Sequence, residues 1–188
     1  IAQWSADRNF SGLLQCGSFN QSCATSFIDN QAWKIIRRPF SNDERQRYLN
    51  MAKGESTQGD VKSGIQLAIS ALLSSPQFLY RHEIGEPVSG LGNGVYKLTP
   101  YELASFLSYA FSNTTPDDTL LQAAKNNQLV TDVQIENQVS RLLDTASAQS
   151  MMEELVHNWL GTDLILNQQK DASQFANFKQ VAPHMMAE

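Results

Sequence analysis

Apolar residues recur every three to four positions along most of the chain, which is the spacing of one face of an α-helix. Residues 60–75 are a clear example, with Val61, Ile65, Ala68, Ile69 and Leu72 on one stripe. The same spacing predicts further helices over residues 23–38, 41–54, 98–112, 115–128, 131–144 and 146–161. Strand-like alternation never persists beyond a few residues. We therefore expect an all-α fold, an irregular multi-helix bundle of about seven to eight helices in two packed halves.

Local start signals support these helices. Ser41 precedes Glu44 by three positions, which is the spacing of a capping box. Thr99, Pro100 and Glu102 occupy the N-cap, N1 and N3 positions of another helix. Thr131 with Gln134 and Thr115 with Pro116 repeat parts of this pattern. Ser75 and Pro76 predict a new short segment, bent away from the preceding helix and carrying Phe78 and Leu79 inward.

The clearest break in the helical pattern is the segment GEPVSGLGNGVYK, residues 85–97, which is rich in glycine and contains a proline. It predicts a Gly-rich linker between an N-terminal helical domain, residues 1–84, and a second helical domain, residues 98–188. The last residues resemble the first turns of a helix, so we expect the second domain to be truncated at its C-terminus. The loop GLGNG, Gly90 to Gly94, lacks the lysine and the preceding strand of a phosphate-binding loop.

The net charge and the length of the apolar runs limit the partners that this chain can bind. The net charge of −5 disfavours nucleic acid, because phosphate binding requires a basic face. No apolar run approaches the roughly 20 residues of a membrane-spanning helix.

Cys16 and Cys23 are the two cysteines, and turn-forming residues lie between them. This spacing favours a local disulfide, which would indicate an oxidising compartment. Two unpaired buried thiols are the alternative. A metal pair is disfavoured, since neither a C-x-x-C motif nor a nearby histidine accompanies them.

The run Arg81-His82-Glu83 is the sharpest candidate site. His82 could act as a general base with Glu83 as its partner. Adjacent helical residues point about 100° apart, however, so this spacing serves a proton relay poorly. The alternative is structural: Tyr80 and Arg81 anchor the turn, with the Arg81 guanidinium paired to a carboxylate or to carbonyls. In that interpretation His82 and Glu83 are solvated and replaceable.

Three further groups have both a functional and a structural interpretation. Asp117-Asp118 could bind metal, but at N2 and N3 of a helix they also compensate the helix dipole. Arg37-Arg38 could recognise an anion, or could bind helix-end carbonyls and acids on a neighbouring element. His157 is interpreted as a partly buried helix-face residue rather than a ligand or base.

Two pairs of segments carry a resemblance to known families. The first pair is IIRRPFSNDERQRYLNM and GIQLAISALLSSPQFLYRHEIG, and the second is YKLTPYELASFLSYAFSNTTPDDTLLQAAKNNQL and QVSRLLDTASAQSMMEELVHNWLG. They resemble two tandem helical domains of unknown function, over residues 23–188, typical of exported proteins of planctomycetes and some proteobacteria. There the domains often accompany a planctomycete-type cytochrome c domain or carbohydrate-binding modules.

The resemblance implies a periplasmic or extracellular location and other domains of the same polypeptide as partners, including a cytochrome c domain or polysaccharide. It transfers no catalytic residue. We expect no cofactor or metal in this chain and haem, if present, in a companion domain. The preferred function is a helical module that supports cytochrome-linked electron transfer. The alternatives are a non-catalytic interaction module and a part of a polysaccharide-processing protein.

Overall fold

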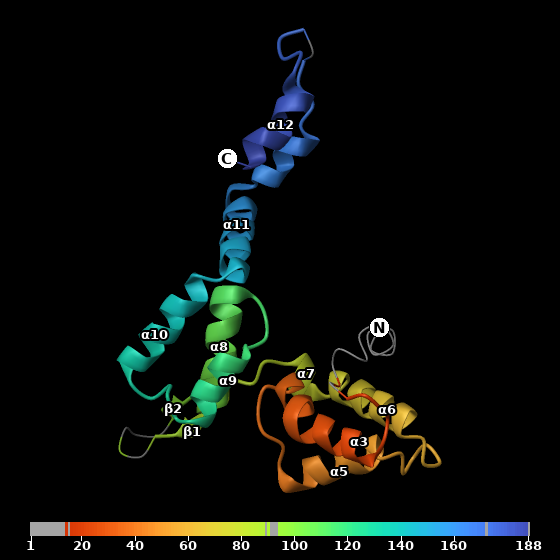
Figure 1. Ribbon diagram of the computed structural model, residues 1–188. Helices are drawn as coiled ribbons and strands as arrows, with labels where there is room; N and C mark the ends of the chain where they lie inside the picture. Colours follow the sequence, from red (N-terminus) through yellow and green to blue (C-terminus); the bar gives the residue numbers. More distant parts are fainter. Residues whose placement is uncertain (1–13, 15, 89, 91–93, 172, 188) are drawn as a thin grey trace.

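The computed structural model describes residues 14, 16–88, 90, 94–171 and 173–187, and the structural statements below concern this part of the chain. Helices form two lobes and a projecting C-terminal arm (Figure 1). Strand pairing is limited to one two-stranded hairpin within the described residues. The prediction of an all-α fold is confirmed.

The first lobe packs its helices around a single apolar cluster. Its elements are α3 (Gln21–Phe27), the π-helix η1 (Ile28–Ala32), α4 (Trp33–Ile35), α5 (Asn42–Ala52), α6 (Val61–Leu73) and α7 (Pro76–Leu79). The largest fully buried side chains of this cluster are Phe27, Ile28, Ile65 and Leu72. Ser41 and Glu44 form the expected capping box of α5, and Ser75 caps α7 with Pro76 in the first helical turn.

The contact between α5 and α6 depends on Gly64. A Cβ atom placed there would lie 2.5 Å from the Met51 carbonyl oxygen and 2.9 Å from that of Ala52. Real side chains do not approach a backbone this closely. The absence of a side chain at Gly64 therefore allows the two helices to meet.

A disulfide joins Cys16 and Cys23, with 5.8 Å between their Cα atoms, as the spacing predicted. It ties the segment before α3 to the first turn of that helix, where Asn20 is the N-cap and accepts from the Cys23 N–H. Cys23 is buried in the core of the first lobe, so the disulfide links the incoming chain to that core.

The second lobe contains a hairpin and three helices. Strand β1 (Glu86–Pro87) pairs antiparallel with β2 (Tyr96–Lys97), so the ends of the Gly-rich segment are extended and paired. Helices α8 (Pro100–Ser112), α9 (Asp118–Lys125) and α10 (Asp132–Leu143) follow. Their core contains Ala104, Leu107, Leu120, Ala123, Ala124, Leu129 and Leu142.

The expected capping boxes of α8 and α10 are present, but the predicted start of α9 is wrong. The cap is Asp117, whose carboxylate accepts from the Leu120 N–H at 2.8 Å, and α9 begins at Asp118. Asp117 and Asp118 are therefore N-cap and N1, not N2 and N3. Asp117 is also bound by Arg141 of α10, a contact between distant residues that the local spacing of Thr115 and Pro116 does not reveal.

The arm consists of α11 (Ala146–Leu160), the 3-10 helix η2 (Thr162–Asn167) and α12 (Phe178–Ala187). The base of α11 packs on α8 and α10, while η2 and α12 pack on each other at the far end (Figure 1). Gly161 ends α11 in the left-handed conformation, with φ of 64°. Among the described residues, no helix has both the length and the apolar character that a bilayer span requires.

Candidate functional site

Arg37 is the central side chain where the first lobe meets the second. It follows α4, is 5% exposed, and has a left-handed φ of 61°. Its guanidinium donates to the carbonyls of Gln77 at 2.7 Å and Tyr80 at 3.0 Å, with longer contacts to that of Phe78. The last carbonyls of a helix lack intrahelical donors, so Arg37 caps the C-terminal end of α7 from a distant segment.

Tyr109 of α8 lies against two guanidinium groups. The Cζ atom of Arg37 is 5.8 Å and that of Arg81 is 4.9 Å from the centroid of its ring, which is within cation–π range. The ring thus joins the second lobe both to the first lobe and to the connecting segment.

The structure does not show the expected pairing of Arg81 with a carboxylate or a carbonyl. Arg81 is exposed, and it forms neither a hydrogen bond nor an ion pair with the residues described. The chain is extended at Tyr80, with φ of −110° and ψ of 147°, which leads the following residue out of the core. The carbonyls at the end of α7 are already bound by Arg37, so the anchoring role falls to Arg37.

The residues around Arg81 are also largely exposed. Tyr80 is 67% exposed and contributes only its carbonyl to the Arg37 contact. Leu79 is 62% exposed, so the expectation that it points inward is wrong, whereas Phe78 is half-buried. Helix α7 has four residues, and none of them is buried. His82 and Glu83 are exposed.

Arg38 forms the second half of the arginine pair and binds an acid. Its guanidinium forms two hydrogen bonds to the Glu44 carboxylate, at 2.9 and 2.8 Å. That carboxylate also accepts from the Ser41 N–H in the capping box. The hydrogen bond from Arg38 is the largest cause that lowers the pKa of Glu44 to about 2. Arg37 and Arg38 thus bind carbonyls and an acid respectively, which is the structural interpretation of the pair.

Glu102 holds the connecting segment against α8. One carboxylate oxygen accepts from the N–H groups of Ile84 at 3.1 Å and Gly85 at 3.2 Å, and the other accepts from the N–H and hydroxyl of Thr99, both at 2.8 Å. Burial alone would raise the pKa of Glu102, but these hydrogen bonds outweigh it and the pKa is lowered. The capping acid of α8 therefore also fixes the chain that enters the second lobe.

Two further contacts join the lobes directly. Trp33 and Tyr101 meet edge to face, with ring centroids 6.5 Å apart and planes at 84°. Lys34 and Asp118 form an ion pair at 2.7 Å. Asp118 is mostly exposed, so this pair adds little stability.

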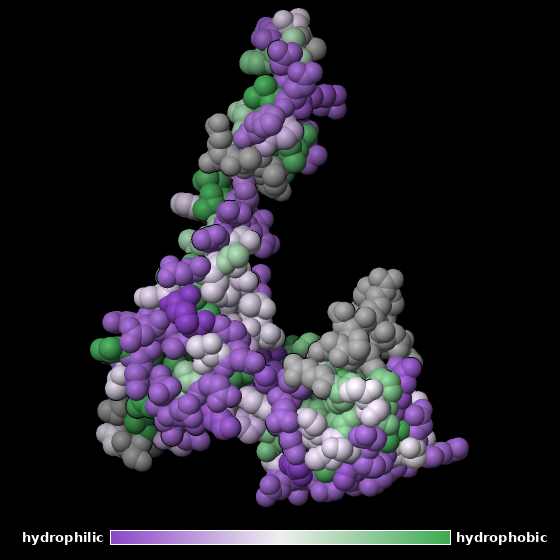
Figure 2. All heavy atoms as spheres, in the orientation of Figure 1, coloured by the Kyte–Doolittle hydropathy of each residue, from purple (hydrophilic) through white to green (hydrophobic). Residues whose placement is uncertain are grey.

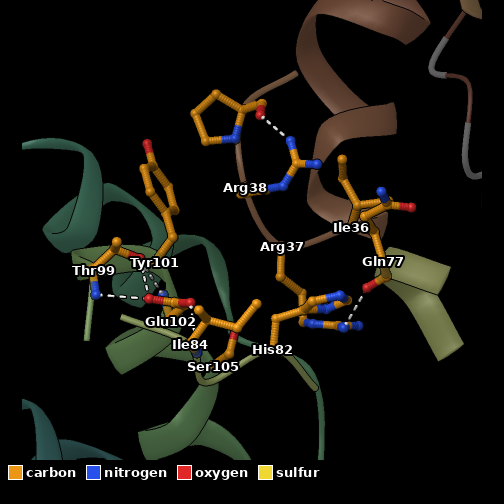
Figure 3. A pocket seen from close by; sticks show the side chains of 11 residues that line it. Ile36, Arg37, Arg38, Gln77, His82, Ile84, Thr99, Tyr101, Glu102 and Ser105 are labelled. Carbon is orange, nitrogen blue, oxygen red and sulfur yellow. Dashed lines mark hydrogen bonds between the residues drawn. The ribbon is translucent and has the colours of Figure 1, made fainter. Parts of the chain in front are cut away.

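A cavity of about 450 Å³ lies at this junction. Figure 3 shows side chains of both lobes and of the connecting segment around it. It is lined by Ile36, Arg37, Arg38, Pro39, Gln77, His82, Ile84, Thr99, Tyr101, Glu102 and Ser105. His82 is therefore the one member of the Arg81-His82-Glu83 run that lines this cavity.

Sequence reasoning missed the face of α8 that meets the first lobe. Tyr101, Ser105 and Tyr109 follow each other at intervals of four residues, which places them on one side of the helix. This spacing of polar and aromatic residues was the available signal. The apolar stripe of the same helix, which faces the core of the second lobe, obscured it.

The remaining candidates lie away from the junction cavity. The Nδ1 atom of His157 lies 2.6 Å from the Thr162 hydroxyl, and its ring is half-buried near the end of α11. Asp117 binds Arg141 of α10 at 2.6 and 3.1 Å. Both contacts fix the ends of neighbouring elements.

Helix α11 of the arm carries an exposed apolar stripe. Along α11 it comprises Met152, Leu155, Val156, Trp159 and Leu160, which recur at intervals of three, one, three and one residues on one face. Trp159 is 82% exposed. Further exposed apolar residues lie beyond α11: Leu164, Leu166, Phe175, Val181 and Met185. Figure 2 shows separate groups of apolar residues among polar ones on the visible face of the arm.

Comparison with protein families gave two matches in tandem. Residues 23–83 match the family described as PSD5, protein of unknown function (DUF1595), and residues 98–188 match the family described as PSD4, protein of unknown function (DUF1592). Two consecutive parts of the chain are thus similar to families of unknown function. Searches of curated proteins and of solved structures returned no match.

Proposed function

We propose that this chain is a helical assembly module of an exported multidomain protein, and that its arm binds another domain of the same polypeptide. The observation that carries this proposal is the exposed apolar stripe on α11. Monomeric soluble proteins rarely leave a contiguous apolar patch of this kind uncovered, and such patches mark interaction surfaces. The spacing of the stripe suits an amphipathic partner helix, which would insert its own apolar residues between those of α11.

The disulfide supports the proposed location. Disulfides persist in oxidising compartments, so the bond between Cys16 and Cys23 favours a periplasmic or extracellular setting. In that setting the module would hold a companion cytochrome c domain in position for electron transfer, with haem bound by the companion and no cofactor in this chain. Polysaccharide is the alternative partner of a companion domain.

Hydrogen exchange of the arm tests the assembly role. Amides of residues 150–160 should exchange measurably more slowly in the full-length polypeptide than in this chain alone, because a bound domain would cover α11 and oppose its fraying. Equal exchange in the two proteins would refute the proposal.

Matched substitutions on α11 sharpen the test. Leu155→Glu and Trp159→Glu place a charge in the stripe and should abolish the additional protection. Glu153→Gln alters an exposed residue outside the stripe and should leave it unchanged. Loss of protection in all three variants would indicate general destabilisation of the helix instead of a lost interface.

A further inference from the structure

The junction cavity contains several hydrogen-bonding side chains that have no protein partner. Ser105 is 9% exposed, and neither its hydroxyl nor that of Tyr101 forms a hydrogen bond to another residue in the described part of the chain. The same holds there for the Gln77 side-chain amide and the His82 ring. Both lobes and the connecting segment therefore present free polar groups to one cavity.

Arg37 adds a buried positive charge that no carboxylate neutralises directly. Its NH1 and NH2 groups bind carbonyls, while its Nε–H finds no acceptor among the residues that the structure describes. The guanidinium of Arg81 lies against the same Tyr109 ring as that of Arg37, so a second cation lies close to Arg37. A buried charge without an ionic partner is costly, and an anionic ligand would reduce that cost.

The carboxylates around the cavity are already engaged. Glu102 accepts four hydrogen bonds from Ile84, Gly85 and Thr99, and Glu44 is bound by both terminal nitrogens of Arg38 and by Ser41. The groups that remain free can each donate a hydrogen bond: a guanidinium N–H, two hydroxyls and an amide, of which the hydroxyls and the amide can also accept. Such a set complements a ligand that is rich in acceptors.

We propose that the junction cavity binds a small organic carboxylate, with its charged group near Arg37 and its polar substituents on Ser105, Tyr101 and Gln77. The volume of about 450 Å³ lies within the usual range for small-molecule sites. Ile36, Pro39 and Ile84 supply the apolar part of the lining, which suits a carbon skeleton more than an inorganic anion. A ligand held this way would contact both lobes at once.

Titration followed by amide NMR tests the proposal, with succinate as the carboxylate probe, succinamide as its neutral analogue and inorganic phosphate as the non-carboxylate anion. Succinate should give saturable shifts at Ser105, Tyr101 and His82, and succinamide should bind at least about tenfold more weakly, because it lacks the charge that strengthens the hydrogen bonds. Equal binding of succinamide, no saturation by succinate, or tighter binding of phosphate would each overturn the proposal.

Substitutions locate the site without disturbing the Arg37 contact on which folding depends. Ser105→Ala and Tyr101→Phe each remove one hydroxyl, and each should weaken succinate binding about tenfold, since each loses a hydrogen bond to a charged ligand. Arg47→Gln removes an exposed cation of α5 that does not line the cavity, and should bind succinate like the wild type. A loss in Arg47→Gln equal to that in the cavity variants would show that succinate binding is not specific to the cavity, and would overturn the assignment.

Discussion

Replacing Arg37 should destabilise the protein far more than replacing Arg81, although both guanidinium groups lie against Tyr109. Arg37→Ala removes two short hydrogen bonds, at 2.7 and 3.0 Å, and leaves the carbonyls of Gln77 and Tyr80 without donors. At about 1.5–3 kcal/mol for each bond from a charged donor, the loss for the two bonds is about 3–6 kcal/mol. Arg81→Ala removes only an exposed cation–π contact, which contributes about 0.5–1 kcal/mol.

A glycine variant separates the side-chain contribution from the backbone strain. Arg37 has a φ of 61°, a conformation that costs a residue with a Cβ atom about 1–2 kcal/mol relative to glycine. Arg37→Gly loses the same hydrogen bonds as Arg37→Ala but relieves that strain. It should therefore be more stable than Arg37→Ala by about 1 kcal/mol, partly offset by the greater freedom of glycine in the unfolded chain.

Urea unfolding monitored by circular dichroism measures all three variants against the wild type. The expected order of stability is wild type, Arg81→Ala, Arg37→Gly and then Arg37→Ala. If Arg81→Ala lost as much stability as Arg37→Ala, the anchoring role assigned to Arg37 would be refuted. An Arg37→Gly variant less stable than Arg37→Ala would refute the strain argument alone.

Three further predictions concern the pH response, the helix contact and the disulfide of the first lobe. The pKa of Glu44 is lowered to about 2 in the folded protein. The ionised Glu44 carboxylate therefore contributes to the free energy of unfolding above the ordinary pKa of glutamate, and this contribution is lost as the pH falls towards 2. Glu44→Gln should consequently show a smaller loss of stability between pH 5 and pH 2, measured by urea unfolding at several pH values; an unchanged pH profile would contradict the pairing with Arg38. Gly64→Ala should lower the free energy of unfolding by about 1–3 kcal/mol through overpacking, whereas Gly17→Ala, where a Cβ meets nothing within 4 Å, should behave like the wild type in the same assay. Replacing Cys16 and Cys23 by serine should lower the free energy of unfolding by about 2–2.5 kcal/mol, because the unfolded chain gains freedom without the disulfide. Mass spectrometry of non-reduced wild-type peptides should find the two cysteines linked. Two free thiols in protein from an oxidising compartment would contradict the disulfide.

Helix starts were the most predictable part of the fold, because their signals lie within a few consecutive residues. Ser41 with Glu44 and Thr99 with Glu102 form capping boxes in the structure. The start of α9 was misplaced because Thr115 and Asp117 are both suitable caps by local sequence. Asp117 also binds Arg141, which is 24 positions away, and no local signal shows this contact.

The junction was less predictable, because it depends on contacts between residues about 40 positions apart. Nothing in the local sequence distinguishes Arg37 from Arg81 as the partner of the α7 carbonyls. The choice follows from the left-handed backbone at Arg37, which turns its side chain towards α7, and from the extended backbone at Tyr80. The second role of Glu102, as acceptor for Ile84 and Gly85, was hidden for the same reason.

The segment between the lobes is held at two points that lie close together in the sequence. The Tyr80 carbonyl is bound by Arg37, and the Ile84 N–H is bound by Glu102. Only Arg81, His82 and Glu83 lie between these points. For folding, the number of residues in this stretch matters more than their identity, since an insertion or deletion would change the distance that it spans. Homologues should therefore tolerate changes of residue type in this segment more readily than changes in its length.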